Sequence, residues 1–170
     1  AARLGGYYKL KYFRRCDHLI GNTRDLCDYL VQGGWADERV HYLPNFVAAE
    51  TAPAVAREQH ETPETAPLIL ALGRLHPIKG FDVLLHALAK LPGAYLWLLG
   101  EGEERTVLES LTAELGLGDR VRFLGWRDRP AAYYAAADVI ACPSRREALG
   151  NVVIEAWAHG CPVVATSSTG

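Results

Sequence analysis

The sequence contains no methionine, no long apolar run and no excess of charge of one sign. A membrane-spanning helix needs about 20 consecutive apolar residues, and no run in this chain approaches that length. The net charge is −2, which argues against nucleic-acid binding through bulk positive charge. Because the chain begins with Ala1 and has no methionine at all, we expect it to be a fragment of a longer protein.

Metal and redox motifs are also missing. The four cysteines lie far apart in the sequence, whereas zinc and dithiol motifs need pairs at short spacing. The six histidines form no HxH or HxxxH pair. The pattern therefore predicts reduced cytosolic thiols and no metal site.

The second half of the chain alternates apolar runs with helical patterns. The strand-like runs are residues 68–73, 94–100, 120–125, 138–143 and 162–166, and the helical patterns are residues 80–91, 103–116, 129–137 and 151–159. Strands that are apolar throughout and alternate with helices predict a parallel sheet covered on both faces. Right-handed crossovers make this a doubly wound α/β domain, which we expect to be incomplete at both ends.

The composition changes around residue 48. Residues 48–67 are rich in Ala, Thr, Glu and Pro and show no apolar period, so we interpret them as a linker or exposed loop. This predicts three parts: residues 1–47 as the end of a first domain and a crossover, the linker, and residues 68–170 as a truncated second domain.

The first part has its own local signals. We expect a basic, aromatic helix, a strand, a helix capped by Thr23 and ended by Gly33 and Gly34, and a second strand, at residues 7–15, 18–22, 23–34 and 39–43. The basic helix is interpreted as an ordinary amphipathic element, with contact to an anionic membrane surface as the alternative.

The loop after the first strand of the second half, GRLHPIKG, carries two cations between glycines. Arg74 and Lys79 would lie at the carboxyl end of a strand, where ligands bind in open α/β sheets. Arg offers a planar donor fork for phosphate oxygens and Lys a point charge. The alternative is two solvated surface cations on an ordinary loop.

Two further loops invite functional readings that we reject. GEGEER, residues 100–105, resembles the start of a dinucleotide fingerprint, but Arg105 replaces the third glycine. Its acids would repel a pyrophosphate, so a tight strand-to-helix turn explains it and a nicotinamide site is not expected. Ser144 lacks the GxSxG context of a nucleophile, so we expect a capping or solvated serine, and Arg145 and Arg146 stay undecided between solvent and a cleft.

The stretch EALGNVVIE holds carboxylates at residues 147 and 155. On one continuous helix they would lie about 80° apart. Gly150 argues against helix at Glu147, and Asn151 is a good N-cap. We therefore predict Glu147 in a loop and Glu155 in a helix whose N-terminus can bind an anion. The alternative is a loop acid and a helix acid without a ligand.

Taken in order, GRLHPIKGFD, GEGEE, RVRFLGW and ADVIACPSRREALGNVVIEAWAHGCPVVAT resemble the retaining nucleotide-sugar glycosyltransferases of family 4, which have the GT-B fold. The Glu-x7-Glu spacing is that family's signature. The resemblance covers residues 68–170, the nucleotide-sugar donor domain and a Rossmann-like half of the fold. Residues 16–47 look like the end of the acceptor domain.

The resemblance implies roles for the cationic loop. Gly73, Arg74 and Lys79 would bind the donor diphosphate, and the implied catalytic set is Arg74, Lys79 and Glu147. Such enzymes work without a bound metal or cofactor, with the nucleotide sugar as substrate, so the cations would stabilise the leaving diphosphate.

The resemblance also assigns the stretch with the two acids. Glu147 would face the donor sugar, and Glu155 would bind the ribose hydroxyls. The backbone of Leu149, Gly150 and Asn151 would meet the phosphates and the sugar. Where the family often has Glu-Gly-Phe, this chain has Glu-Ala-Leu, so the loop shape or the sugar contact differs there.

The implied activity is transfer of a hexose to a glycan or lipid-linked acceptor with retention, in polysaccharide or lipopolysaccharide biosynthesis. We expect a cytoplasmic protein without nucleic-acid partners, with peripheral contact to the inner membrane as an option, and a fragment that is inactive alone. The competing readings are a nucleotide-sugar epimerase of the same fold and a non-catalytic nucleotide-sugar-binding module. A glycan phosphorylase would carry a pyridoxal-bearing lysine site, which the sequence does not show.

Overall fold

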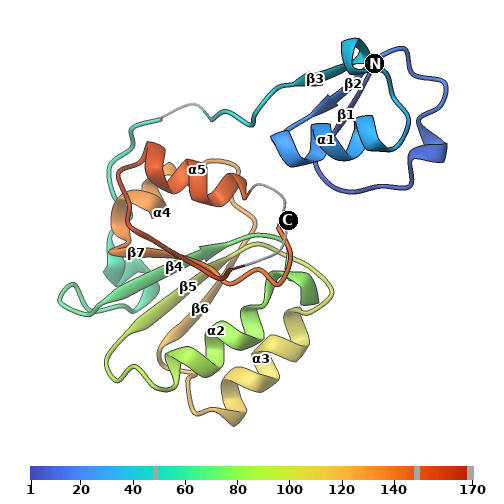
Figure 1. The fold of residues 1–170 in the computed structure, drawn as a ribbon. Helices are drawn as coiled ribbons and strands as arrows, with labels where there is room; N and C mark the ends of the chain where they lie inside the picture. Colours follow the sequence, from blue (N-terminus) through green and yellow to red (C-terminus); the bar gives the residue numbers. More distant parts are fainter. Residues whose placement is uncertain (48–49, 148–149, 168–170) are drawn as a thin grey trace. The chain divides into compact units, whose positions relative to one another are not determined.

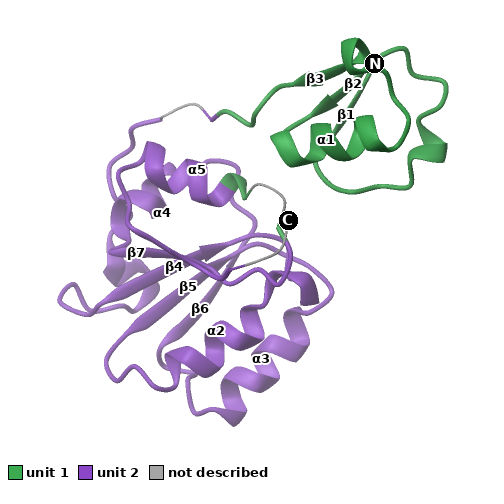
Figure 2. Cartoon of the chain, in the orientation of Figure 1, with its two compact units in different colours: residues 1–46, 147–151, 169–170 green, residues 47–146, 152–168 purple. Residues whose placement is uncertain are grey.

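The computed structural model describes residues 1–47, 50–147 and 150–167, and the chain divides into two compact units (Figure 2). Unit 1 is built mainly from residues 1–46, and Glu147, Gly150 and Asn151 are grouped with it. Unit 2 contains residues 47–146 and 152–168. Each unit has its own apolar core and is described by itself.

Unit 1 is a small parallel sheet with one α-helix. Its three strands pair in the order β1-β2-β3, and its core is formed by four leucines. The elements are β1 Ala2–Leu4, β2 Leu19–Gly21, α1 Arg24–Gln32, the 3-10 helix η2 Asp37–Arg39 and β3 Val40–Tyr42. The Oγ1 atom of Thr23 accepts a hydrogen bond from the backbone N–H of Leu26 at 3.1 Å, and Gly33 follows the helix end. The predicted strand, capped helix and second strand are confirmed.

The helix expected at residues 7–15 is wrong, because only the 3-10 helix η1, Leu10–Tyr12, forms there. Tyr7, Leu10 and Phe13 pack against the core of unit 1, whereas Tyr12 is 72% exposed. Leu10 and Phe13 lie three residues apart at the two ends of η1, so one turn of 3-10 helix, with its three-residue period, is enough to bring both to the core.

Unit 2 is a five-stranded parallel sheet with the strand order β6-β5-β4-β7-β8 (Figure 1). The strands are β4 Leu68–Leu72, β5 Tyr95–Leu99, β6 Val121–Gly125, β7 Val139–Cys142 and β8 Val163–Ala165. The chain adds strands on one side of β4 and then returns to its other side at β7. This reversal is the switch point of a doubly wound sheet, and it confirms the predicted fold class.

Helices cover both faces of this sheet, with α2 and α3 on one face and α4 and α5 on the other (Figure 1). They are α2 Phe81–Leu88, α3 Arg105–Glu114, α4 Ala131–Ala136 and α5 Asn151–Ala158, with the 3-10 helices η3 Arg57–His60 and η4 Pro77–Lys79. Leu96 and Leu98 of β5 face the first cluster, while Trp97 and Leu99 face the second. This alternation follows from the two-residue period of a strand.

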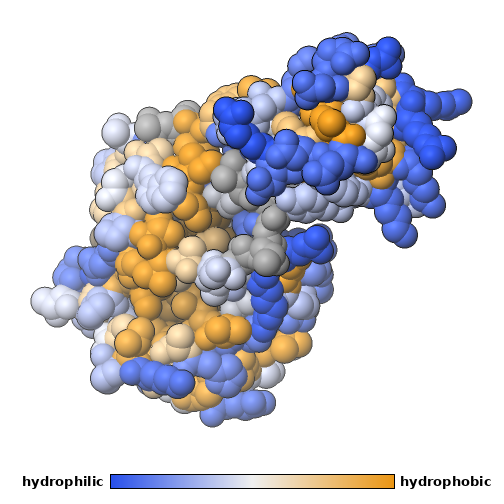
Figure 3. All heavy atoms as spheres, in the orientation of Figure 1, coloured by the Kyte–Doolittle hydropathy of each residue, from blue (hydrophilic) through white to orange (hydrophobic). Residues whose placement is uncertain are grey.

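The edge strand β8 leaves apolar surface uncovered. Val164 is 66% exposed, and Trp157 of α5 is 67% exposed. Figure 3 shows apolar side chains gathered on the face of unit 2 that is in view, whereas hydrophilic side chains dominate unit 1. Within the part of the chain that is described, no helix combines the length and the hydropathy required to cross a bilayer.

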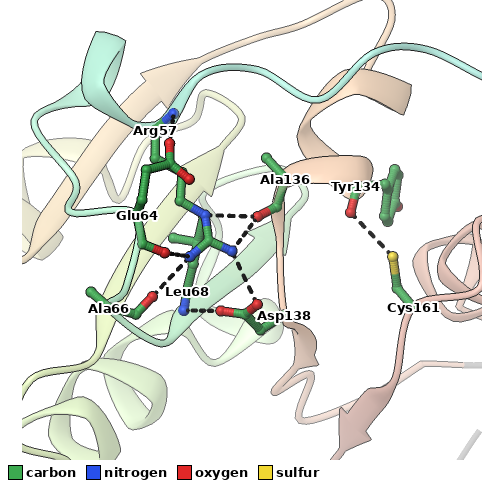
Figure 4. Close-up of polar contacts among 8 residues, drawn as sticks. All are labelled: Arg57, Glu64, Ala66, Leu68, Tyr134, Ala136, Asp138 and Cys161. Carbon is green, nitrogen blue, oxygen red and sulfur yellow. Dashed lines mark hydrogen bonds and ion pairs between the residues drawn. The ribbon is translucent and has the colours of Figure 1, made fainter.

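Residues 50–67 belong to unit 2 and are attached to it by Arg57, whose side chain is only 12% exposed. Its guanidinium donates, at 2.7–3.1 Å, to the carbonyls of Glu64, Ala66 and Ala136 and to the carboxylate of Asp138 (Figure 4). Asp138 in turn accepts from the N–H of Leu68 at 2.7 Å. Residues 48 and 49 lie outside the described residues, and the linking role of residues 48–67 stays a prediction.

We expect replacement of Arg57 by alanine to lower the free energy of unfolding of unit 2 by about 3 kcal/mol, because half-buried carbonyls and a carboxylate lose a charged donor. Urea denaturation followed by tryptophan fluorescence measures the change, since Trp97 is fully buried. The control Lys90→Ala, at an exposed position, should change it by no more than about 0.5 kcal/mol. Equal effects of the two variants would contradict the anchoring role.

Candidate functional site

Two loops leave the sheet side by side at its switch point. Strands β4 and β7 pair directly, with Ile69 opposite Val139 and Leu70 opposite Ile140. The loop after β4, residues 73–80, and the loop that begins at Pro143 after β7 therefore start at the same edge. Ligands of doubly wound sheets bind at this place, so the topology selects these two loops as the candidate site.

Gly80 allows these loops to approach each other closely. Its φ is +68°, and a Cβ atom added there would lie 2.2 Å from the carbonyl oxygen of Pro143. Both features exclude a side chain, because L residues rarely adopt this φ and backbone atoms cannot yield. Gly80 also ends η4, the turn that carries Lys79.

Arg145 joins the same two loops through its side chain and backbone. Its guanidinium binds the carboxylate of Asp82 at 2.6 and 2.7 Å and the carbonyl of Pro77 at 2.6 Å. Its N–H donates to the carbonyl of Ile78 at 2.8 Å. These hydrogen bonds hold the pKa of Asp82 below its ordinary value and raise the pKa of Arg145. Arg145, which the sequence left undecided, thus holds the two loops together.

The loop after β5 packs against the loop after β4. The N–H of Leu75 donates to the carbonyl of Glu101 at 3.0 Å, and the N–H of Glu104 donates to the carbonyl of Leu75 at 3.0 Å. A Cβ atom added at Gly100 would lie 1.9 Å from the Gly73 carbonyl, and one at Gly102 would lie 2.3 Å from that of Leu75. The glycines of GEGEER therefore serve close backbone packing, in agreement with the predicted tight turn.

Arg74 has an acidic partner in that neighbouring loop. Its side chain is 71% exposed and binds Glu103, with Nη2 at 3.1 Å and Nε at 3.2 Å from Oε2. His76 Nε2 lies 3.5 Å from the other oxygen of Glu103. The backbone N–H of Glu103 and the charge of Arg74 lower the pKa of Glu103. Arg74 is therefore paired with Glu103 in the structure, and its role toward a ligand stays a prediction.

Lys79 lies close to the start of its loop. The half-buried lysine has its Cε atom 3.7 Å from the position of a Cβ atom on Gly73. The structure thus brings Gly73, Arg74 and Lys79 together at one loop, while their roles toward a diphosphate stay predictions.

The two acids of EALGNVVIE occupy different elements. Glu147 lies in the loop after β7, and Glu155 lies in α5, which begins at Asn151. The predicted separation into a loop acid and a helix acid is confirmed. Gly150 directly precedes the helix, and Leu149 lies outside the described residues. Glu147, Gly150 and Asn151 are grouped with unit 1 and Glu155 with unit 2, and their proposed contacts with a ligand stay predictions.

Glu155 lines a pocket of unit 2 with a volume of about 370 Å³. The hydroxyl of Tyr134, a fully buried residue of α4, donates to Glu155 Oε2 at 2.9 Å. The other lining residues are Val47, Glu50, Asp128, Arg129, Pro130, Ala131 and His159. Sequence reasoning missed Tyr134, although the two tyrosines in the otherwise all-alanine helix α4 are a signal of buried contacts.

Ser144 was expected to cap or to be solvated. It is 2% exposed, which excludes the solvated role and leaves the capping role a prediction, and its carbonyl accepts from the hydroxyl of Thr166 at 2.5 Å. The loop after β7 is therefore packed against the segment after β8, which removes Ser144 from solvent.

Metal-ligand groups are not clustered in the described ranges, since no three His, Cys, Asp or Glu side chains there lie close enough to hold an ion. All four cysteines are free thiols, and burial raises the pKa of Cys161.

Comparison of the sequence with known proteins shows the family to which the chain belongs. The sequence model of the family described as "Glycosyl transferases group 1" matches residues 54–170. The chain is 44% identical over 170 residues to the lipopolysaccharide core biosynthesis glycosyltransferase LpsE of Rhizobium meliloti (strain 1021), covering 99% of this chain and 50% of LpsE. The chain thus spans about half the length of the curated relatives it matches.

Solved structures show the same fold. Sucrose-phosphate synthase from Thermosynechococcus elongatus aligns with a TM-score of 0.76 and 34% identity, over 89% of this chain and 41% of that one. Anabaena HepE, solved in complex with UDP-glucose, aligns with a TM-score of 0.80 and 27% identity, over 91% of this chain and 46% of that one. Unit 2 is a Rossmann-like half of a GT-B fold, and the chain belongs to the group 1 family of glycosyl transferases.

Proposed function

We propose that the whole protein is a retaining glycosyltransferase of family 4 that moves a hexose from a nucleotide-sugar donor to an acceptor in lipopolysaccharide core biosynthesis. The observation that carries this proposal is the cationic loop of Arg74 and Lys79 at the switch point of the sheet, next to the loop that leads to Glu147. Family membership and the similarity to LpsE support the activity and the pathway class.

The donor would lie along unit 2 with its diphosphate at the cationic loop. Arg74 offers a fork for two phosphate oxygens and Lys79 a compact charge. Glu155, at the pocket on α5, would accept hydrogen bonds from the ribose hydroxyls. The similar HepE was solved with UDP-glucose, which supports a uridine nucleotide as the first donor to examine.

Catalysis would depend on stabilising the leaving nucleoside diphosphate. Negative charge develops on it as the glycosidic bond breaks, and fixed cations aimed at that charge lower the barrier. We propose that Arg74 and Lys79 do this. Glu147 would face the donor sugar, and no metal or further cofactor would be required.

The acceptor would be a glycan or a lipid-linked glycan at the cytoplasmic side of the inner membrane. The similarity to a lipopolysaccharide core enzyme supports this choice. An epimerase would convert the donor without an acceptor, and a binding module would convert nothing. Donor turnover measured with and without acceptor separates these alternatives from a transferase.

Replacing Arg74 by alanine should weaken UDP binding to the full-length protein at least tenfold, because a charged hydrogen bond to phosphate contributes about 1.5–3 kcal/mol. Isothermal calorimetry measures the dissociation constant. Lys90→Ala, which removes an exposed cation elsewhere in unit 2, is the matched control and should leave it unchanged. The proposed function fails if no nucleoside diphosphate binds the unmodified protein, or if both variants bind as it does.

Glu103→Gln should strengthen UDP binding about two- to fivefold. The substitution removes the carboxylate that pairs with Arg74 and His76, and an exposed ion pair of this kind competes only weakly with a ligand. Glu101→Gln provides a control in the same loop, because Glu101 pairs with Arg105 instead. Weaker or unchanged binding in Glu103→Gln alone would show that Glu103 does not compete with the ligand.

A further inference from the structure

We propose that Tyr134 is a positioning residue that holds the Glu155 carboxylate for the hydroxyls of the donor ribose, and thereby sets the preference for ribonucleotides over deoxyribonucleotides. The inference rests on the proposed function, which assigns Glu155 to the ribose. It adds a residue from a different helix, because Tyr134 belongs to α4 and Glu155 to α5.

The hydrogen bond between the two residues has a fixed donor and a fixed acceptor. Tyr134 is 0% exposed, and its hydroxyl lies 2.9 Å from Glu155 Oε2. Burial, and then the charge of Glu155, raise the pKa of Tyr134 far above its ordinary value. The hydroxyl therefore stays protonated and is the donor of the hydrogen bond to Glu155.

Tyr134 is itself held at two places, its ring and its backbone. It stacks on His159 with ring centroids 4.7 Å apart and planes 11° apart. His159 Nδ1 donates to the backbone carbonyl of Glu155 at 2.7 Å. The carbonyl of Tyr134 accepts from Cys161 Sγ at 3.2 Å (Figure 4). These contacts leave the hydroxyl little freedom, so it can fix the carboxylate that it binds.

Glu155 retains the acceptor capacity that a diol requires. A carboxylate has about four lone-pair sites, and in the described part of the chain its oxygens receive one hydrogen bond, from Tyr134. The side chain is half-buried and lines the 370 Å³ pocket together with Tyr134 and His159. Two neighbouring ribose hydroxyls could donate to the remaining sites. Because the carboxylate is already held, little side-chain entropy is lost when they bind.

A purely structural role for the bond is the competing explanation. In that case Tyr134 would only tie α4 to α5, and its loss would lower stability or weaken all ligands alike. The ratio of affinities for a ribonucleotide and a deoxyribonucleotide separates the two explanations, because only a role at the ribose changes that ratio.

The test measures dissociation constants of UDP and 2′-deoxy-UDP by calorimetry in the full-length protein and in Y134F. 2′-Deoxy-UDP lacks one hydroxyl that would donate to the charged Glu155 carboxylate. We therefore expect the unmodified protein to bind UDP about tenfold or more tightly than 2′-deoxy-UDP. We expect Y134F to reduce this preference about three- to tenfold, mainly through weaker UDP binding. Tyr133→Phe makes the same change at the neighbouring residue, whose hydroxyl accepts from Arg127, and should keep the preference.

Other variants separate this inference from the proposed function. If Glu155→Gln removes the preference while Y134F keeps it, Tyr134 has no positioning role and the proposed function stands. If Glu155→Gln keeps the preference, the assignment of Glu155 to the ribose falls, and this inference with it. If Y134F does not fold, His159→Leu is measured instead, because it removes the ring that stacks on Tyr134 and leaves the Tyr134 hydroxyl in place. An unchanged preference of His159→Leu for UDP over 2′-deoxy-UDP then overturns the proposal.

Discussion

The direct pairing of β4 with β7 is the constraint on which the rest of unit 2 depends. Backbone groups in a buried parallel sheet must be hydrogen-bonded, so the chain adds β5 and β6 on one side of β4 and then crosses to the other. That reversal opens the edge at which the loops after β4 and β7 diverge. The candidate site thus arises from strand order, and its chemistry is supplied by the loop residues.

Close backbone packing gives these loops their shape. Gly80 and Gly100 sit where an added Cβ would meet a carbonyl oxygen of the neighbouring loop. Arg145 adds a bidentate bond to Asp82 across the same gap. The two arginines of these loops differ in their partners. Arg145 joins two loops of the protein, whereas Arg74 is 71% exposed and pairs only with the exposed carboxylate of Glu103 among the contacts described above. Exposed pairs exchange partners at low cost, which would suit the role proposed for Arg74, in which it binds and releases a diphosphate.

The pocket beside α5 follows a different principle. Tyr134 of α4 and His159, which directly follows α5, are held by packing and hydrogen bonds, and both contact Glu155. A carboxylate held in this way can be specific for the geometry of a diol, whereas a mobile one accepts any donor. The cationic loop and the pocket would therefore contribute differently to the binding of one ligand. The loop would mainly provide affinity for the phosphates, and the pocket would mainly select the ribose.

The sequence by itself determined the order of strands and helices in residues 68–170, because apolar runs and helical periods report which residues are buried. It also placed Glu147 in a loop and Glu155 in a helix, since Gly150 and Asn151 act locally. It failed at residues 7–15, where one turn of 3-10 helix brings Leu10 and Phe13 to the core in place of an α-helix. Only the tertiary structure decided that Arg145 binds Asp82 and that Tyr134 binds Glu155. Periodicity shows that a side chain is buried, but its partner depends on strand order and crossover, which bring distant residues together.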